Sequence, residues 1–219
     1  SDTTWVINNM VTTPGYYGYY HYYNENTMVY HNSFNITGNG YALYCYQGSD
    51  NEFINNSVVI NTSGYYAIYN YYGFDVMDYN NWYIPGSNTY MAYIDGTLAN
   101  SWTQFQGAGG HNDSSRYGDP GYFSFTDLHT GSVQLNNWAD TNVAYNFAPL
   151  DIDGEKRPYS PDKRADVGAD EFYVADYDVD IVQIDGPISG NIGNNTVVAT
   201  FRNAGKNAIT NDTVFVQYS

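Results

Sequence analysis

Acidic side chains that recur at turns are the first candidates for chemistry in this sequence. Asp50 and Asp75 stand at equivalent turn positions of successive repeats, and Asn26 stands at the corresponding position one repeat earlier. Carboxylate and amide oxygens are ligands that Ca²⁺ accepts, and a pair of carboxylates is what a glycosidase needs. The separation of carboxylates across repeats is not visible in a sequence, so both sites stay open beside the interpretation that we favour, a row of solvated turns.

A second acidic motif, DIDGE at residues 151–155, is similar to the start of a Ca²⁺-binding loop. It lacks the glycine at the sixth position and the glutamate at the twelfth position of an EF-hand. We therefore predict a structural turn held by ion pairs, with Arg157 or Arg164 as the cation and Asp166 or Asp170 as a nearby carboxylate. Ca²⁺ is the one cofactor that the sequence leaves open, and we assign no catalytic residue.

The histidines do not have the spacing of metal ligands: His21, His31, His111 and His129. His21 aligns with Cys45 and Asn70 in the next two repeats, which predicts a row of buried, hydrogen-bonded polar residues and a small core residue at Cys45. No Ser-His-Asp arrangement stands out.

Tyrosines are the most distinctive candidates, because they recur at fixed positions of the stretches GYYGYYHYY, GYALYCYQ and GYYAIYNYY. Stacked rings would stabilise the fold. An aromatic platform would bind carbohydrate, with ring faces against sugar C–H groups and hydroxyls bonded to sugar hydroxyls. An exposed aromatic surface is also typical of protein contacts. Under the second interpretation we predict six ligand-binding residues: Tyr20, Tyr22, Tyr44, Tyr46, Tyr69 and Tyr71.

The elements that position these residues repeat about every 24 residues. Four asparagines mark the repeat at intervals of 23, 24 and 25 residues: Asn9, Asn32, Asn56 and Asn81. Between them, alternation predicts strands in which Tyr19, Leu43 and Ile68 share one face and the candidate tyrosines share the other. Asparagine tolerates the left-handed backbone of a sharp corner, and stacked asparagines bond to one another along an axis. Stacked repeats of this kind predict a parallel β-helix.

Further motifs follow the repeats in a recognisable order: YNNWY (79–83), WTQF (102–105), GDPGYF (118–123), DLH (127–129), DIDGEKRP (151–158) and DVGADEF (166–172). With the coils, this series resembles the closing part of secreted bacterial right-handed parallel β-helix proteins of the pectate-lyase-like superfamily, over residues 1–174. The resemblance implies secretion through a dedicated outer-membrane route. The enzyme activities it implies are those of polysaccharide lyases, hydrolases and epimerases. Lyases of this family use Arg, Lys and Ca²⁺ on the outer coil face, whereas residues 1–115 contain no Lys or Arg.

Composition limits the remaining classes. The 219 residues are 18% aromatic and 14% charged, with a formal net charge of −16, so we expect a folded protein with no nucleic-acid partner. Because the chain has a single cysteine, it cannot form an internal disulfide. The sequence contains no run of about 20 apolar residues, so we expect no membrane insertion. The chain begins SDTTWVINN, without a signal peptide, so we expect a processed protein or a fragment.

The rest of the chain divides into two predicted parts. Residues 84–174 lose the period and are expected to form loops and small strands that cap coils 1–83. Residues 176–219 contain VDIVQI, NNTVVATFRNAGKNAIT and TVFVQY, alternating stretches between turns that resemble the start of a CARDB-like, immunoglobulin-type domain. A complete sandwich needs about 100 residues, so we predict an incomplete one, completed by further sequence or by strand addition from another chain.

The sequence therefore predicts an all-β protein: a right-handed parallel β-helix with an irregular C-terminal cap, followed by an incomplete immunoglobulin-like β-sandwich. We expect a non-enzymatic structural or adhesive segment of a large secreted bacterial cell-surface protein or fibre, with polysaccharide or another surface component as partner. The alternatives are a fragment of a carbohydrate-active enzyme, and a filament subunit that self-associates through the chain ends.

Overall fold

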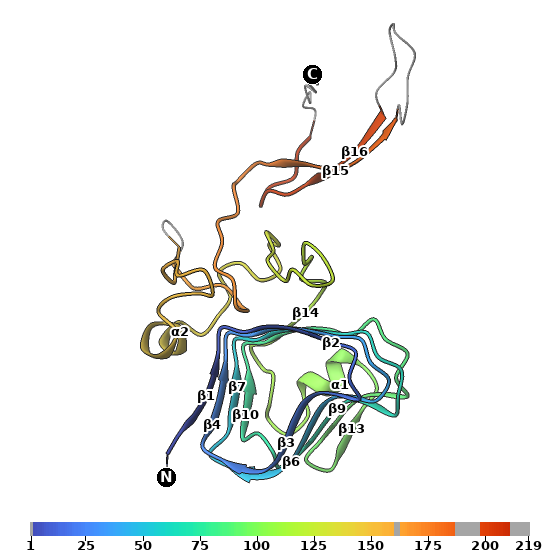
Figure 1. Cartoon of the computed structure of the whole chain (residues 1–219), viewed down its shortest axis with the longest axis vertical. Helices are drawn as coiled ribbons and strands as arrows, with labels where there is room; N and C mark the ends of the chain where they lie inside the picture. Colours follow the sequence, from blue (N-terminus) through green and yellow to red (C-terminus); the bar gives the residue numbers. More distant parts are fainter. Residues whose placement is uncertain (1, 160–162, 187–197, 211–219) are drawn as a thin grey trace, which may run out of the picture. The chain divides into compact units, whose positions relative to one another are not determined.

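The chain folds into a parallel β-solenoid followed by a small antiparallel sheet, as a computed structural model shows (Figure 1). The structure describes residues 2–159, 163–186 and 198–210. Two compact units divide the chain, Ser1–Tyr173 and Val174–Ser219. In the described part no helix has the length and apolar character needed to cross a membrane. The prediction of an all-β fold built on a β-helix is confirmed.

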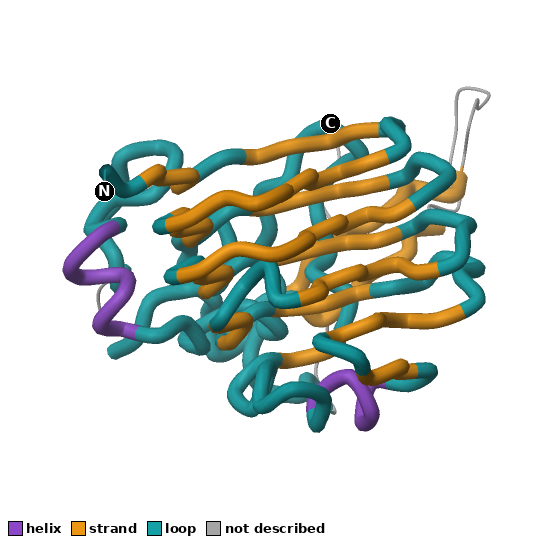
Figure 2. Tube along the Cα trace, turned by 90° about the horizontal axis from the view of Figure 1, so that it is seen from below, coloured by secondary structure: helices purple, strands orange, loops and turns teal. Residues whose placement is uncertain are grey.

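Three sheets form the sides of the solenoid, and each coil contributes one strand to each sheet (Figures 1 and 2). The first sheet contains β1 (Thr4–Ile7), β4 (Thr27–Tyr30), β7 (Glu52–Ile54) and β10 (Val76–Asp78). The second contains β2 (Met10–Thr13), β5 (Ser33–Ile36), β8 (Ser57–Ile60), β11 (Asn81–Tyr83) and β14 (Arg116–Tyr117). The third contains β3 (Tyr17–Glu25), β6 (Tyr41–Ser49), β9 (Tyr66–Tyr71), β12 (Tyr90–Ile94) and β13 (Thr97–Ala99). Neighbouring strands of the three sheets pair in parallel, except that β13 pairs antiparallel with β12.

The interior is a column of apolar side chains, because each strand turns one set of its residues inward. Phe53 stacks between Phe34 and Trp82, with ring centroids 6.2 and 5.7 Å away. Leu43 and Ile68 are fully buried in the same column. A coil cannot bury this face alone, so the stack of coils is the unit that folds.

At the corner between the first and second sheets, each coil has a pair of adjacent residues with different roles. Left-handed backbone is adopted by the first residue of each pair, with φ from 51° to 62°: Asn8, His31, Asn55 and Tyr79. The second residue of each pair forms what we call the asparagine ladder: Asn9, Asn32, Asn56 and Asn80.

From the second rung onward, each ladder amide oxygen accepts a hydrogen bond from the backbone N–H of the previous rung, at 2.8–3.0 Å. Asn80 ends the series by donating its backbone N–H to Ser115 Oγ. The sequence-based choice of Asn81 as the fourth marker is therefore wrong by one residue. The Asn80–Asn81 pair offers two candidates, and only the pairing of Asn81 with Ser57 in β8 and β11 distinguishes them.

The segment that follows the coils has two parts. The coils extend past residue 83, where the sequence predicted their end, because β12 pairs in parallel with β9. Residues 95–117 cover the end of the solenoid, where α1 (Trp102–Gln106) places the buried Phe105 edge-on against Trp82, at 5.4 Å between ring centroids. Residues 118–173, with α2 (Thr141–Phe147), run back along the side of the coils. Their contacts there include Thr12 Oγ1 and Asn35 Nδ2, both of which donate to the carbonyl of Phe125.

The C-terminal unit contains an antiparallel pair, β15 (Val179–Gly186) and β16 (Val198–Asn203), with two register shifts. Arg202 on β16 forms an exposed ion pair with Asp180 on β15, at 2.9 Å. The third predicted stretch, TVFVQY at residues 213–218, lies outside the described residues. The pair agrees with the predicted small β domain, and its assignment to the CARDB class stays a prediction.

Candidate functional site

All six predicted tyrosines lie on the outer face of the third sheet, in register from coil to coil. Tyr20 pairs with Tyr44, and Tyr44 with Tyr69. Their rings stack at 5.5 and 5.0 Å, with interplanar angles of 8°. Tyr93 on β12 extends this row at 5.1 Å from Tyr69. We call this series the first tyrosine row.

A second tyrosine row runs beside the first, two residues further along each strand. Tyr22 stacks on Tyr46 at 5.3 Å, and Tyr46 stacks on Tyr71 at 5.5 Å. The interplanar angles are 17° and 28°. The predicted arrangement of the six side chains on one face is therefore present, while ligand binding by them stays a prediction.

The sequence analysis missed a third tyrosine row. It comprises Tyr17, Tyr41, Tyr66 and Tyr90, whose successive rings lie 6.1, 6.0 and 5.5 Å apart. Strict alternation would turn Tyr41 and Tyr44 to opposite faces. In the structure the two intervening residues, Ala42 and Leu43, are both fully buried, so both tyrosines face outward.

Small residues make this break in alternation possible, and they are the signal that could have revealed it. At Gly18 an added Cβ would lie 2.5 Å from Ile36 Cδ1, so a larger side chain there would collide with the core. Alanine takes the corresponding inward place at Ala42 and Ala67, both fully buried. A recurring Gly or Ala just before an inward residue thus marks the point where the period of two shifts by one.

The stacking decides which atoms of the tyrosines meet solvent. A ring stacked on a neighbour above and below has its faces covered, so ring edges and hydroxyls are presented outward. Tyr20 and Tyr22 on the first coil are 52% and 45% exposed, whereas Tyr44 and Tyr69 are half-buried. The expectation of open ring faces along the whole surface is therefore corrected to rows of phenol edges and hydroxyls.

Burial affects the acidity of several phenols in these rows. Burial raises the pKa of Tyr69 to about 12, and the neighbouring phenols of Tyr44 and Tyr93 add to the shift. Burial likewise raises the pKa of Tyr44 and Tyr17. These three hydroxyls therefore keep a proton to donate and lone pairs to accept.

On the inward face of the same strands, His21, Cys45 and Asn70 form the predicted buried polar row, and all three are fully buried. His21 Nε2 lies 3.2 Å from Asn51 Nδ2, and burial lowers the pKa of the imidazole. Burial raises the pKa of the Cys45 thiol well above its ordinary value. A neutral imidazole and a protonated thiol enclosed in the core have a structural role.

Asp50 and Asp75 do not occupy equivalent positions, which corrects the sequence-based alignment. Glu52 pairs with Val76, so the residue opposite Asp75 is Asn51. Asp75 Oδ2 accepts the backbone N–H of Asn51 at 3.0 Å, as Asn51 Oδ1 accepts that of Thr27. Asp75 thus caps a second buried hydrogen-bonded series, while Asp50 is exposed at a left-handed turn. The two residues form no Ca²⁺ or carboxylate pair.

The DIDGE motif forms a structural turn, as predicted. Asp151 Oδ1 accepts the backbone N–H groups of Asp153 and Glu155 at 3.0 and 2.7 Å. Its other oxygen accepts the N–H of Glu171 at 3.0 Å. Asp151 is buried, so its carboxylate joins this turn to the DVGADE segment.

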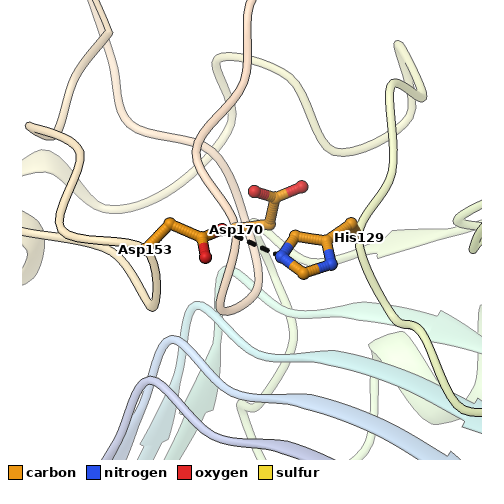
Figure 3. A group of neighbouring side chains, drawn as sticks. All are labelled: His129, Asp153 and Asp170. Carbon is orange, nitrogen blue, oxygen red and sulfur yellow. Dashed lines mark hydrogen bonds and ion pairs between the residues drawn. The ribbon is translucent and has the colours of Figure 1, made fainter.

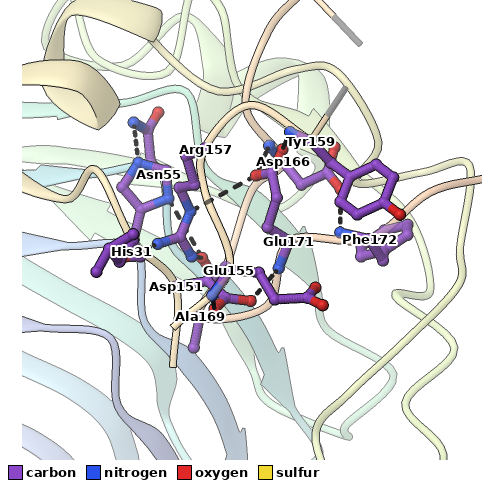
Figure 4. Close-up of polar contacts among 12 residues, drawn as sticks. His31, Asn55, Asp151, Glu155, Arg157, Tyr159, Asp166, Ala169, Glu171 and Phe172 are labelled. Atoms are coloured by element: carbon purple, nitrogen blue, oxygen red, sulfur yellow. Dashed lines mark hydrogen bonds and ion pairs between the residues drawn. The ribbon is translucent and has the colours of Figure 1, made fainter. Parts of the chain in front are cut away.

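Arg157 ties the turn to the coils (Figure 4). Its buried guanidinium donates to Asn8 Oδ1 at 2.8 Å and to the Gly168 carbonyl at 2.9 Å. Its Nε lies 3.6 Å from Glu171 Oε2. The ion pair is therefore with Glu171, where Asp166 or Asp170 was predicted, because the turn of the chain at Gly168 brings Glu171 alongside.

Gly168 is the tip of the loop that docks on the coils. Its φ of +104° favours glycine, and an added Cβ would lie 2.9 Å from Ser33 Oγ. Its carbonyl also accepts from His31 Nδ1 at 3.2 Å. The DVGADE motif therefore fastens residues 118–173, which we call the side segment, to the corner of the solenoid.

Arg164 acts differently from Arg157. It donates to the carbonyls of Ala139 and Trp138, and its guanidinium carbon lies 5.5 Å from the ring centroid of Trp138. Carbonyl and ring contacts thus replace the carboxylate partner that the sequence suggested for it.

One histidine does meet metal-ligating groups, which the sequence analysis missed. His129 Nε2 lies 2.9 Å from Asp153 Oδ2, and Asp170 completes a group whose ligand atoms all lie within 4.8 Å of one another (Figure 3). His129 Nδ1 contacts Asp127. These residues come from three separate stretches of the chain, so no local spacing in the sequence predicts that they meet. The other pairing of a histidine with an acid, His111 with Asp95 at 3.3 Å, has no third ligand among the described residues.

Burial and neighbouring charges tune this group. Burial pulls the pKa of His129 down, but the hydrogen bonds to Asp127 and Asp153 outweigh it and leave the pKa raised. Burial raises the pKa of Asp170, while its hydrogen bond from the Thr130 backbone opposes the rise. Three acidic side chains thus surround one imidazole.

Comparison with known proteins returns no family model, no curated protein and no solved structure that matches this chain. The functional argument therefore depends on the geometry of the tyrosine rows and of the side segment.

Proposed function

We propose that this chain is a non-enzymatic structural or adhesive segment of a secreted bacterial cell-surface protein, and that the three tyrosine rows bind polysaccharide. One observation carries the proposal. Eleven tyrosines lie in register on one outer sheet, as rows of four, three and four rings: Tyr20, Tyr44, Tyr69 and Tyr93; Tyr22, Tyr46 and Tyr71; Tyr17, Tyr41, Tyr66 and Tyr90.

The regular spacing of the rows suits a repeating ligand. The coil rise of about 4.8 Å sets the separation of equivalent hydroxyls along each row. A polysaccharide also presents hydroxyls and C–H groups at regular intervals, so one chain can satisfy several rungs at once. Repeated weak contacts of this kind give avidity that a single tyrosine cannot supply.

Charge selects a neutral polysaccharide. Residues 1–115, which include all three rows, contain no Lys or Arg, and the chain has a formal net charge of −16. An anionic glycan would meet no counter-charge there and would be repelled. Uncharged phenol hydroxyls match the hydroxyls of a neutral glycan, with which they exchange hydrogen bonds in both directions.

The rigid solenoid gives the adhesive role its mechanical basis. Stacked coils hold the rows in a fixed geometry, so little side-chain entropy is lost on binding. The β15–β16 pair supports the further proposal that a CARDB-like, immunoglobulin-type module follows the solenoid. A carbohydrate-active enzyme is the alternative, and it requires clustered acids in a cleft on one β-face of the coils.

The test is a binding screen on a glycan array, followed by titration of any hit. The informative variant is Tyr44→Phe/Tyr69→Phe, because it removes two central hydroxyls and keeps the stacked rings. We expect neutral polysaccharides to bind, and we expect the double variant to weaken binding about tenfold or more. This corresponds to the loss of two hydrogen bonds at about 0.5–1.5 kcal/mol each.

The matched control is Tyr145→Phe/Tyr177→Phe, which removes two hydroxyls from exposed tyrosines outside the solenoid sheets. It should bind like the unmodified chain. Equal losses in both double variants, or exclusive binding of anionic glycans, would contradict the proposal. Absence of glycan binding combined with self-association through this face would assign the rows to a protein contact.

A further inference from the structure

We propose that His129, Asp153 and Asp170 bind one divalent transition-metal ion of the Zn²⁺ type, which holds three stretches of the side segment together (Figure 3). This site is independent of the tyrosine rows, because its residues lie in the segment 118–173. It is also distinct from a Ca²⁺ loop in the DIDGE motif, where the Asp151 carboxylate is occupied by backbone N–H groups.

The positions of the ligand atoms fit a small ion. A Zn²⁺ ion with bonds of 2.0–2.2 Å to nitrogen and oxygen holds tetrahedral ligands about 3.3–3.6 Å apart. His129 Nε2 and Asp153 Oδ2 are already 2.9 Å apart, and the full set lies within 4.8 Å. Shifts of about an ångström in His129 and Asp153, whose side chains are 34% and 56% exposed, would complete the geometry. The fourth position is left for water.

The histidine is oriented as metal-bound histidines are. Its Nδ1 contacts the carboxylate of Asp127, which keeps a proton on Nδ1, so an ion bound at Nε2 would take the place of the proton that Nε2 shares with Asp153. A carboxylate behind the imidazole fixes the tautomer and increases the basicity of the ligand. Asp170 is held as well, because its Oδ2 accepts the backbone N–H of Thr130 at 3.1 Å.

Charge and ligand type both favour a transition metal. Asp127, Asp153 and Asp170 bring three carboxylates around one imidazole, and Asp170 is only 8% exposed. A cation at the centre would offset the repulsion between these carboxylates. Imidazole nitrogen suits Zn²⁺ and its neighbours in the transition series, whereas Ca²⁺ takes six to eight oxygens and Mg²⁺ prefers oxygens with several waters.

The three ligands join three stretches of the side segment. His129 follows the loop that bonds to Thr12 and Asn35 through Phe125. Asp153 belongs to the DIDGE turn, and Asp170 follows the Gly168 tip. An ion that bridges them would hold the loop, the turn and the tip in the arrangement that packs on the coils, so metal binding should stabilise the folded chain.

The test uses the full chain after treatment with a chelator, titrated with Zn²⁺ and separately with Ca²⁺ by isothermal calorimetry. We expect one Zn²⁺ per chain and no comparable Ca²⁺ binding. At one hundred times the Kd, Zn²⁺ should raise the melting temperature by about 5–10 °C.

Variants locate the site. Asp153→Asn and His129→Gln should each abolish the Zn²⁺-dependent rise in melting temperature. Asp127→Asn should weaken Zn²⁺ binding about 10–100-fold, because Asp127 supports the imidazole and is not itself a proposed ligand. Asp113→Asn is the matched control, since it removes one exposed carboxylate elsewhere and should leave the Kd unchanged.

Circular dichroism of each apo variant checks that the fold persists, and Asp153, whose side chain is 56% exposed, is the ligand whose replacement disturbs packing least. Several outcomes would overturn the proposal: no saturable Zn²⁺ binding, Ca²⁺ binding of equal strength, or a Kd that Asp153→Asn and Asp113→Asn leave equally unchanged.

Discussion

The asparagine ladder and the tyrosine rows both place one residue per coil along the same solenoid, yet different forces hold them. The ladder is buried except at its first rung, and its amides bond to one another and to backbone groups at 2.8–3.2 Å. The tyrosine rows lie outside and contact through stacked rings 5.0–6.1 Å apart. The ladder therefore depends on directional bonds that only an amide of this length makes, whereas the rows depend on contact area.

This difference separates stability from binding. A buried ladder residue has no group left for a ligand, because each polar atom already has a partner. A tyrosine in a row contributes its faces to stacking and keeps its edge and hydroxyl for solvent or ligand. Removing a ladder side chain should therefore affect folding strongly, while removing a hydroxyl from a row should affect binding alone.

Asn56→Ala should produce the largest effect. It removes the acceptor of the buried Asn32 backbone N–H and the donor to the Val29 carbonyl. With two buried groups unsatisfied, the free energy of unfolding should fall by about 3–5 kcal/mol, measured by denaturant titration. Asn9→Ala is the control, because Asn9 is exposed at the end of the ladder, and it should cost less than about 1 kcal/mol. Equal losses in the free energy of unfolding for the two variants would show that burial does not make one rung of the ladder more important than another.

His31→Asn should flatten the acid dependence of stability at the ladder corner. Burial, and then the charge of Arg157, hold the pKa of His31 well below its ordinary value. The Asn55 amide also donates to Nε2, at 2.9 Å, while Nδ1 donates to the Gly168 carbonyl, so the neutral ring has no free site for a second proton. Asparagine tolerates the left-handed backbone at this corner, where φ is 51°.

The sign follows from proton binding. Below about pH 6.5 the unfolded chain takes up a proton at this histidine and the folded chain does not, so the free energy of unfolding falls by about 1.4 kcal/mol per pH unit. Below about pH 6.5 the variant should lack this part of the slope, so its stability should fall less steeply as the pH is lowered. Parallel curves for the two proteins in denaturant titrations would show that His31 does not titrate on unfolding.

Tyr69→Ala and Tyr69→Phe should have the smallest effects and should differ from each other. Alanine removes two stacked pairs, with Tyr44 and with Tyr93, and should cost about 1–3 kcal/mol. Phenylalanine keeps both pairs and should stay within about 0.5 kcal/mol of the unmodified chain. A loss from Tyr69→Phe as large as that from Tyr69→Ala would mean that the hydroxyl, and not the ring, stabilises the row.

Sequence reasoning went furthest where the structure repeats. The strands that carry Tyr20, Tyr44 and Tyr69 were predicted together with their common face, because a period of two within a period of about 24 is a local signal. The same reasoning failed by one residue at Asn81 and at Asp75, where neighbouring residues offer equal candidates and only cross-coil hydrogen bonds decide. It also missed the third tyrosine row, because two successive inward residues interrupt the alternation.

The sequence by itself determined the coils, the asparagine spacing and the tyrosine-rich face, since each coil carries its own copy of the pattern. Tertiary structure alone decided the partner of Arg157, the docking of Gly168 and the meeting of His129 with Asp153 and Asp170. The physical reason is distance along the chain. Residues 118–173 fold back on coils more than a hundred positions earlier, as the bond from Arg157 to Asn8 shows, and no periodic signal records where such a segment comes to lie.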